Sequence, residues 1–465
     1  MLGRTRRIHF VGIGGIGMSG IAELLANLGY DVSGSDAKRS DVTRRLETLG
    51  VTVATGHDGT HVGEADVVVV SSAIGPDNPE VAEARRRHVP VIPRAEMLAE
   101  LMRLRYGIAI AGAHGKTTTT SMIALVLDRA GLDPTAVIGG RLSAFGSNAR
   151  LGKGDCMVVE ADESDRSFLK LSPAIAVITN IDREHMESYG TWDNLQQAFA
   201  DFANKVPFYG AVVACADDAP VRALLPRLTR RVITYALEAE ADVIGRGMQL
   251  EAFGSKCTVA QRTAAGVVDL GVLQLRVPGR HNVLNALAAT AVGLEVGLPF
   301  DRMAAAFEEF RGAERRFQTR GEAGGVLVVD DYGHHPTELA AVLAAARAGI
   351  DRRIVAVFQP HRYSRTQQLM DDFGPALSGA DRIVLTDIYA AGEAPIPGIT
   401  VDVLAAAIRR ATTVPVDVIV RLEDVPAAVV RVMQPGDIVL TLGAGSIGSI
   451  GDRILEAIRQ QGRPV

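Results

Sequence analysis

The 465-residue sequence contains only three cysteines, Cys156, Cys215 and Cys257. So few cysteines at such wide spacing exclude a disulfide framework and match no zinc pattern, which indicates a reducing compartment. No apolar run reaches the ~18 residues that a membrane span needs, and no signal-peptide core follows the basic N-terminus. The net charge of −5 lacks the basic excess of a nonspecific nucleic-acid surface. These absences predict a cytoplasmic protein without nucleic-acid or membrane partners.

The sequence does contain a regular alternation of β-rich runs and helical stretches, which is typical of parallel α/β sheets. The length suggests about three domains of ~150 residues each. We predict a Rossmann-like N-terminal domain over residues 1–106, a central P-loop ATPase-like domain over 107–312 and a Rossmann-like C-terminal domain over 313–465. An irregular β-rich stretch between about 242 and 277 predicts an antiparallel patch at one edge of the central sheet.

The most informative segment, Ile108–Thr120, indicates a strand, a glycine loop and a helix. Backbone N–H groups of such a loop bind phosphate, with Lys116 as a point charge for the outer phosphates and Thr117 as a Mg²⁺ ligand. The spacing is a shortened form, GxxGKT, because Ile110 stands where the strict P-loop pattern has glycine. An ordinary glycine turn is the alternative. The threonine series after the lysine argues against it, since β-branched residues suit an ordinary first helical turn poorly.

A second glycine loop, Gly12–Gly17, follows a predicted strand and opens a predicted helix. Asp36 follows about twenty residues later, as in the dinucleotide-binding fingerprint. Taken alone, this loop favours an NAD-dependent oxidoreductase. The loop allows the backbone to approach a pyrophosphate closely, and Asp36 offers a carboxylate to a ribose hydroxyl. A UDP-sugar has both groups and would therefore also fit. A purely structural glycine turn is the third interpretation.

Acidic and imidazole side chains follow two further predicted strands of the central domain. Glu160 ends the first and is a candidate Mg²⁺ ligand beside Thr117, although a solvated acidic loop is the alternative. His185 follows the next strand, where a second metal or phosphate role is reasonable. These residues meet the glycine loop only if the sheet brings their strands together.

Three polar clusters lie beyond residue 278. In the first, Asn282 is a good helix N-cap, while His281 and Asn285 could reach a nucleotide base. In the second, Arg315 and Arg316 are either an exposed pair or a stabiliser of transferring phosphoryl charge.

The third cluster consists of the loops 330–337 and 359–365, which each follow a predicted strand. They are rich in His, Tyr and Arg, and they suit a small zwitterion because arginine binds carboxylates bidentately. His334, His335 and His361 lack the accompanying ligand spacing that would support zinc.

Seven motifs in order resemble the Mur ligase family over essentially the whole chain. They are GIGGIGMSG at 12–20, GAHGKTTTT at 112–120, EADESD at 160–165, TNIDREHMESYG at 179–190, GRHNVLNALAA at 279–289, DDYGHHPTE at 330–338 and FQPHRYSR at 358–365. The resemblance implies a ligase of peptidoglycan precursor synthesis. ATP would phosphorylate the lactyl carboxylate of UDP-N-acetylmuramic acid, and the amine of L-alanine would attack the acyl phosphate. The first glycine loop would then hold UDP instead of NAD.

The resemblance also implies a role for individual residues. The UDP-sugar would contact Gly14, Gly15, Ile16, Gly17, Asp36 and Ser72. ATP would contact Gly112, His114, Gly115, Lys116, Thr117, Thr118, Asn282, Asn285 and Asp331. Mg²⁺ would be held by Thr117, Glu160 and His185, and the amino acid by Tyr332, His361, Arg362 and Arg365. The catalytic groups would be Lys116, His185, Arg316 and His334.

One departure from the family pattern separates its branches. Several relatives carry a carbamylated Mg²⁺-binding lysine after the histidine equivalent to His185, whereas residues 194–201 contain no lysine and Lys205 is out of register. The alanine-adding branch similarly lacks it. The main alternative is the muropeptide-recycling branch, which adds a ready-made peptide, although the segment 185–189 looks more like the alanine adder. A non-catalytic nucleotide-binding module would leave the acids, histidines and arginines at three sheet edges unexplained.

Overall fold

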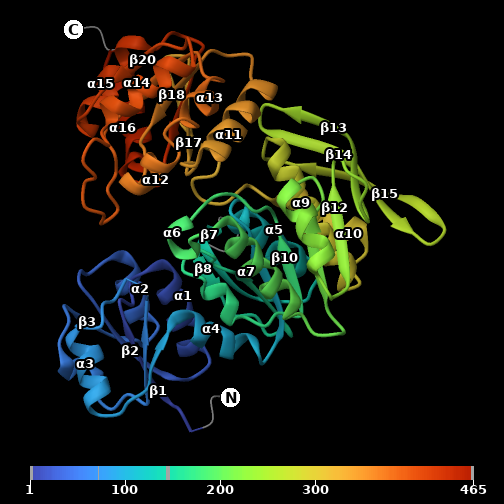
Figure 1. Cartoon of the computed structure of the whole chain (residues 1–465), viewed down its shortest axis with the longest axis vertical. Coiled ribbons are helices and arrows are strands. Elements are labelled where there is room, and N and C mark those ends of the chain that lie inside the picture. The colour runs from blue at the N-terminus through green and yellow to red at the C-terminus, as the bar shows by residue number, and fades with distance from the viewer. Residues whose placement is uncertain (1–3, 72, 143–146, 462–465) are drawn as a thin grey trace. The chain divides into compact units, whose positions relative to one another are not determined.

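The computed structural model describes residues 4–71, 73–142 and 147–461 (Figure 1). Residue contacts divide the chain into two compact units. The first comprises Met1–Met248, Cys257–Leu273 and Leu284–Ala313, and the second comprises Gln249–Lys256, Gln274–Val283 and Glu314–Val465. The described residues form three sheets with helices between their strands. The predicted three-domain α/β architecture is therefore confirmed.

The N-terminal sheet is parallel throughout and has the strand order β3-β2-β1-β4-β5. This order is typical of doubly wound nucleotide-binding sheets. Its strands are β1 (Arg7–Val11), β2 (Asp31–Asp36), β3 (Thr52–Thr55), β4 (Val67–Val70) and β5 (Val91–Pro93). Its helices are α1 (Ile16–Asn27), α2 (Asp41–Thr48), α3 (Pro79–Arg86) and α4 (Arg94–Met102).

The central sheet has ten strands in the order β15-β14-β13-β12-β11-β10-β6-β9-β7-β8. Its first strands in the chain are β6 (Tyr106–Ala111), β7 (Thr135–Leu142), β8 (Ser147–Arg150), β9 (Cys156–Glu160) and β10 (Ile175–Ile178). The others are β11 (Ala211–Cys215), β12 (Val232–Ala236), β13 (Val243–Glu251), β14 (Gly254–Thr263) and β15 (Gly266–Leu275). The last three occupy one edge, where the sequence predicts a β-rich patch. Strand β6 lies between β10 and β9 and is parallel to both, so the three carboxyl ends meet at one rim.

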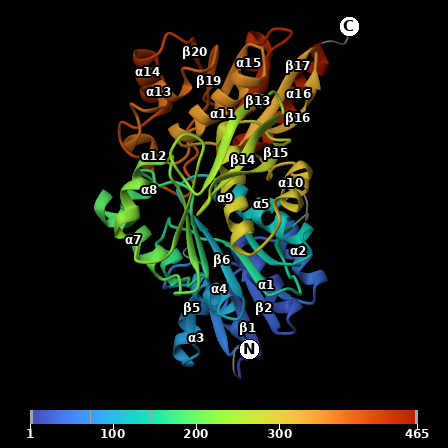
Figure 2. The ribbon, with the colours of Figure 1, turned by 90° about the vertical axis from the view of Figure 1, so that its right-hand side faces the viewer.

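Six helices of the described chain accompany this sheet: α5 (Lys116–Arg129), α6 (Met186–Tyr189), α7 (Trp192–Asn204), α8 (Ala219–Leu224), α9 (Arg280–Glu295) and α10 (Phe300–Glu309). Helix α5 is buried along most of its length, and α10 lies beside it (Figure 2). Phe168 packs against Phe199 and Phe202 of α7, with ring centroids 5.3 and 5.1 Å away. This packing anchors the acidic segment after β9 to the body of the domain.

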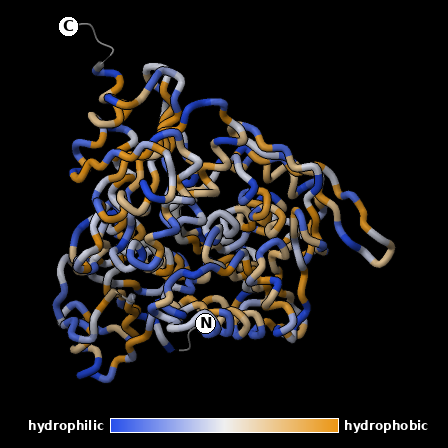
Figure 3. The backbone as a smooth tube through the Cα atoms, turned by 45° about the horizontal axis from the view of Figure 1, so that its top comes forward, coloured by the Kyte–Doolittle hydropathy of each residue, from blue (hydrophilic) through white to orange (hydrophobic). Residues whose placement is uncertain are grey.

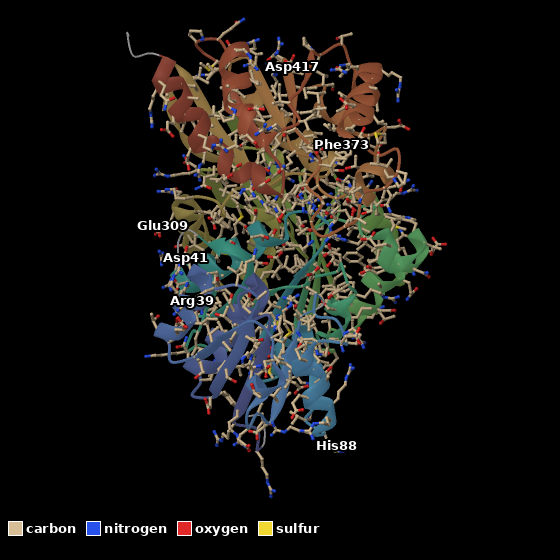
Figure 4. The ribbon with its side chains drawn as sticks, turned by 90° about the vertical axis from the view of Figure 1, so that its left-hand side faces the viewer. Arg39, Asp41, His88, Glu309, Phe373 and Asp417 are labelled. Atoms are coloured by element: carbon tan, nitrogen blue, oxygen red, sulfur yellow. The ribbon has the colours of Figure 1, made fainter. Side chains whose placement is uncertain are left out.

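The C-terminal sheet has the order β16-β17-β21-β18-β19-β20, with β16 antiparallel to β17 and the other pairs parallel. Its strands are β16 (Gln318–Ala323), β17 (Val326–Asp331), β18 (Ile354–Phe358), β19 (Arg382–Leu385), β20 (Val416–Val418) and β21 (Ile438–Leu442). Its helices are α11 (Pro336–Gly349), α12 (Tyr363–Gln368), α13 (Phe373–Leu377), α14 (Val401–Ala411), α15 (Val425–Val432) and α16 (Ile450–Gln461). Phe373, labelled in Figure 4, packs on Phe358 with centroids 5.5 Å apart.

Hydrophobic and hydrophilic segments interleave along the backbone (Figure 3). Such interleaving follows from buried apolar strands that end in polar loops. All three cysteines are buried and unpaired. Within the described residues, no helix is both long and apolar enough to cross a membrane.

Candidate active site

The GxxGKT segment forms the predicted strand, loop and helix, with β6 ending at Ala111 and α5 beginning at Lys116. Gly115 adopts a left-handed conformation at φ 80°, and a Cβ there would fall 2.6 Å from Asn285 Oδ1. At Gly112 a Cβ would fall 2.0 Å from Thr179 Oγ1. Only glycine satisfies these contacts and dihedrals. The loop and the N-terminus of α5 therefore have the geometry that suits anion binding.

Lys116 is held by three acceptors of the protein. Its ammonium donates to the carbonyl oxygens of Gly112 and Ala113 at 2.6 and 3.1 Å and to Glu163 Oε1 at 2.8 Å. Burial lowers the pKa of Lys116, but the carboxylates of Glu163 and Glu160 outweigh burial and raise it overall. Lys116 therefore carries a positive charge within the loop at neutral pH.

Thr117 and Glu160 lie together, as the strand order requires. The Thr117 hydroxyl donates to Glu160 Oε1 and Oε2 at 3.1 and 3.0 Å. Thr117 lies in the first turn of α5, which follows β6, and Glu160 is the last residue of the neighbouring strand β9. A hydroxyl beside a carboxylate offers the hard oxygen ligands that Mg²⁺ takes in proteins.

The loop after β10 supports the glycine loop from its other side. Asn180 Oδ1 accepts from the backbone N–H of His114 at 2.8 Å, and Asn180 Nδ2 donates to the His114 carbonyl at 2.9 Å. The His114 ring lies 2.8 Å from Asp182 Oδ2. These bonds give the β10 rim a positioning role that the sequence did not reveal.

His185 is partly buried and belongs to a group with Glu163 and Glu184, whose candidate ligand atoms all lie within 4.8 Å of one another. Glu163 Oε2 is buried and has no hydrogen-bond partner among the described residues. Burial raises the pKa of Glu163 to about 7, against the opposing charge of Lys116. The backbone of His185 is left-handed at φ 55°, and such conformations in non-glycine residues cluster at functional sites.

Asn285 contacts the phosphate loop, whereas Asn282 has a different local role. Asn285 Oδ1 accepts from the Thr119 hydroxyl at 3.1 Å. The prediction that Asn282 caps α9 is wrong, because the helix begins two residues earlier at Arg280. Asn282 Nδ2 donates to the Pro278 carbonyl at 2.7 Å, since a residue inside the first turn faces the preceding chain.

The N-terminal glycine loop is closed by residues from the end of β2. The Ser35 carbonyl accepts from the N–H groups of Gly12 and Ile13 at 2.8 and 2.9 Å. Asp36 Oδ2 accepts from Gly14 at 2.9 Å, so this carboxylate shapes the loop. Gly15 is the N-cap residue of α1, which begins at the predicted residue Ile16. The predicted residue Ser72 lies outside the described residues.

Two features of this domain escaped the sequence-based prediction. The guanidinium of Arg94 lies against Gly17, where an added Cβ would fall 2.4 Å from Nη1. The same guanidinium lies 3.5 Å from the carboxylate of Asp162. Glu80 is fully buried and accepts from Ser35 at 2.8 Å, with the rings of His9 and His57 2.6 and 2.9 Å away. These residues are far apart in sequence and match no motif spacing.

The C-terminal arginines are held by carboxylates and are not an exposed pair. Arg315 Nε donates to Asp330 Oδ2 at 2.8 Å, while Arg316 lies 3.3 Å from Glu338. Both guanidinium groups lie over the Tyr332 ring, with 5.2 and 5.3 Å to its centroid. Burial and Arg316 lower the pKa of His281 to about 4, which keeps that imidazole neutral.

Asp331 is a buried acid in the loop predicted to contact ATP. Its carboxylate accepts from the N–H groups of Phe317 and Gly333, both at 2.7 Å. Burial raises the pKa of Asp331 to about 6, although Arg316 and these N–H donors oppose the shift.

The predicted amino-acid residues come together in the second unit. His334 lies between Tyr332 and His361, and Arg365 Nη1 lies 3.0 Å from His361 Nδ1. Arg362 has φ 69° with ψ 140°, an unusual combination outside glycine. The sequence-based prediction missed Tyr389, which stacks on His361. The sequence signal that could have identified Tyr389 is its position shortly after β19.

The fold and these contacts define a multidomain α/β protein with a glycine loop of the kind that binds phosphate in other proteins. Three family models match it in chain order: the Mur ligase family catalytic domain at 7–106, the Mur ligase middle domain at 110–293 and the Mur ligase glutamate ligase domain at 315–445. The chain belongs to the Mur ligase family.

Curated relatives match the chain over nearly its full length. A UDP-N-acetylmuramate–L-alanine ligase from Anaeromyxobacter sp. (strain Fw109-5) is 56% identical over 452 residues, or 97% of this chain and 98% of that protein. One from Syntrophotalea carbinolica is 54% identical over 461 residues, or 99% and 100%.

Solved structures show the same fold. A UDP-N-acetylmuramate-alanine ligase from Thermotoga maritima superposes with a TM-score of 0.80 at 30% identity, over 98% of this chain and 99% of that one. A murein peptide ligase from Psychrobacter arcticus has a TM-score of 0.70 at 24% identity, over 99% and 100%, and supports the fold alone.

Proposed function

We propose that this protein is an ATP-dependent ligase that joins L-alanine to the lactyl carboxylate of UDP-N-acetylmuramic acid, with release of ADP and phosphate. The observation that carries the proposal is the contact of Thr117, next to Lys116 at the start of α5, with Glu160 at the end of β9. Relatives with more than half of their residues identical carry the corresponding name. The proposal gives the protein a place in peptidoglycan precursor synthesis.

The proposed reaction has two steps. First, a carboxylate oxygen of the UDP-sugar attacks the γ-phosphorus of ATP, the bond to the bridging oxygen breaks and ADP leaves. Then the uncharged amine of L-alanine attacks the carbonyl carbon, the bond to the phosphate oxygen breaks and the amine gives up a proton. Lys116 would neutralise the negative charge of the phosphoryl group in flight. Arg316, His185 and His334 remain the other proposed catalytic groups.

Mg²⁺ is the cation that the proposal requires, and the residues fit it. Thr117, Glu160 and His185 would hold it, and Glu163 contributes a buried carboxylate oxygen without a partner among the described residues. When bound, Mg²⁺ would offset the phosphate charges of ATP. The hydroxyl of Thr117 and the carboxylate of Glu160 remain oriented by their own hydrogen bonds.

The substrates would divide among the three domains proposed at 1–106, 107–312 and 313–465. The UDP-sugar would lie on the Gly12–Gly17 loop, where backbone N–H groups and Asp36 suit a nucleotide diphosphate. ATP would lie on the Gly112–Thr118 loop. The amino acid would contact Tyr332, His361, Arg362 and Arg365, because a guanidinium pairs with its carboxylate. A cytoplasmic location follows from the same proposal, since its co-substrates are cytoplasmic metabolites.

The muropeptide-recycling branch is the second candidate, because a murein peptide ligase has the same fold. The two functions differ only in the incoming amine. The NAD-dependent oxidoreductase interpretation has no support among these matches, since the family models cover all three domains.

Phosphate release tests the proposal. The full chain is incubated with ATP, Mg²⁺ and UDP-N-acetylmuramic acid, and L-alanine, glycine, L-serine or the tripeptide is added separately. We expect release with L-alanine, and mass spectrometry should detect the nucleotide-linked amide. Release with the tripeptide alone would assign the protein to the recycling branch, and no release with any amine would refute ligase activity.

A further inference from the structure

Four rings form a row beside the strand ends of the C-terminal sheet. The centroids of Tyr332 and His334 are 5.6 Å apart, and those of His334 and His361 are 5.3 Å apart. The row continues to Tyr389, whose ring stacks on His361 at 5.6 Å with an interplanar angle of 18°. The proposed function assigns Tyr332, His334 and His361 to the chemistry, but it gives Tyr389 no role.

Tyr389 is held in place by two separate loops, one after β18 and one after β21. Its N–H donates to the Pro360 carbonyl, and its own carbonyl accepts from the N–H of Arg362, both at 2.8 Å. Its side chain lies against the backbone of Gly445, where an added Cβ would fall 2.5 Å from Tyr389 Cγ. The ring thus has a fixed position, although 40% of the residue is exposed.

The stack in turn restrains His361. The guanidinium of Arg365 can only donate, so His361 Nδ1 is the acceptor of their 3.0 Å contact and the ring proton lies on Nε2. The rings of His334 and Tyr389 both lie next to this imidazole, the first tilted at 59° and the second stacked at 18°. Together with the Arg365 contact, these neighbours restrict the orientation of the His361 ring, so the row of rings acts as a wall.

We propose that Tyr389 is a positioning residue that holds the ring of His361 in place and thereby limits the size of the amino acid that the site accepts. This inference rests on the proposed function, in which His361 contacts the incoming amino acid. A rigid wall rejects an added methylene because the wall must move to admit it, and such rejection amounts to about 10–200-fold in specificity. Without the Tyr389 ring, the His361 imidazole can move into the vacated space, and the site can then accept an amino acid with a larger side chain.

The test compares kcat/KM for L-alanine and L-valine in full-length Tyr389→Ala and Tyr389→Phe, measured by phosphate release with ATP, Mg²⁺ and UDP-N-acetylmuramic acid. In Tyr389→Ala the preference for L-alanine should fall by about tenfold or more. Tyr389→Phe should retain the wild-type preference, because it keeps the ring and the hydroxyl makes no hydrogen bond with the described residues.

A second variant displaces the Tyr389 ring without replacing Tyr389 itself. Gly445→Ala must displace the Tyr389 side chain, since the added Cβ would overlap Cγ, and it should also shift the preference. The proposal is overturned if Tyr389→Ala and Gly445→Ala both keep the wild-type ratio, even with a lower overall rate. Wild-type protein that releases no phosphate with L-alanine would refute the proposed function instead.

Discussion

The ammonium of Lys116 and the carboxylate of Glu163 form a buried ion pair with a separation of 2.8 Å. The side chains are 16% and 3% exposed, so little water screens the pair. The lysine that would bind phosphate is therefore already neutralised by the protein. In the proposed function, a nucleotide would have to compete with Glu163 for this ammonium, and Glu163 would then become available to another cation.

Replacing Lys116 by methionine should abolish turnover and destabilise the protein by about 3 kcal/mol at pH 8, because a buried carboxylate loses its partner. The loss should shrink as pH falls, because Glu163 already has a pKa of about 7 beside Lys116 and takes up a proton more readily once that charge is removed. The double variant Lys116→Met/Glu163→Gln should regain stability but not activity. Unfolding transitions and phosphate release measure the two effects, with exposed Lys205→Met as control. Equal stability of the single and double variants would contradict a coupled pair.

Glu160→Gln should raise the Mg²⁺ concentration needed for half-maximal rate by at least about tenfold, since a charged oxygen ligand is lost. The hydrogen bond from Thr117 can persist, because the amide still offers an oxygen. Direct Mn²⁺ binding in the presence of a non-hydrolysable ATP analogue gives a second measurement. Asp165→Asn is the matched control in the same acidic segment, and its exposed carboxylate should be dispensable. An identical Mg²⁺ dependence in both variants would remove Glu160 from the metal site.

Two glycines at opposite ends of α5 allow a matched comparison. Gly115 and Gly131 both have left-handed backbones, at φ 80° and 85°, so alanine at either costs about 1–2 kcal/mol. Only at Gly115 would the new methyl group also meet Asn285, whereas nothing lies within 4 Å at Gly131. Gly115→Ala should raise KM for ATP well above the value for Gly131→Ala. Similar KM values would show that this loop does not approach the nucleotide.

Asp331 should make stability fall as pH rises from about 4 to 6. Its folded-state pKa of about 6 lies above the ordinary value of 3.8, so the folded protein binds the extra proton in this window. The full effect of two pKa units is about 3 kcal/mol. Asp331→Asn should flatten the slope of unfolding free energy against pH, whereas exposed Asp371→Asn should not. An unchanged slope in Asp331→Asn would place its pKa near the ordinary value.

The local elements of the two glycine loops could be predicted from the sequence, because strand, turn and helix signals there lie within a few residues. Strand β4 has the predicted limits of 67–70, and β10 those of 175–178. The start of α9 could not be placed as well. Asn282 has the chemistry of a cap, yet Arg280 already begins the helix. The N–H groups of Asn282 and Val283 already donate to the Gly279 carbonyl, so helical bonding starts before the residue with cap chemistry. Helix ends are placed by local propensity only to within one or two residues.

The pairing of Glu163 with Lys116 and the stacking of Tyr389 on His361 could not be predicted from the sequence. In each pair the partners follow different strands, so their distance depends on sheet order. A linear motif search also has no reason to select Glu80, because a buried carboxylate resembles an exposed one in sequence.

The sequence by itself determined the family, the phosphate loop and the chemical types of the residues around it, because those are carried by short contiguous motifs. Only the tertiary structure decided that β6 lies between β9 and β10, and hence that Thr117 meets Glu160 and His114 meets Asn180. The physical reason is that strand order is set by the packing of the whole sheet. Sites built at the rims of parallel strands therefore draw their residues from distant parts of the chain.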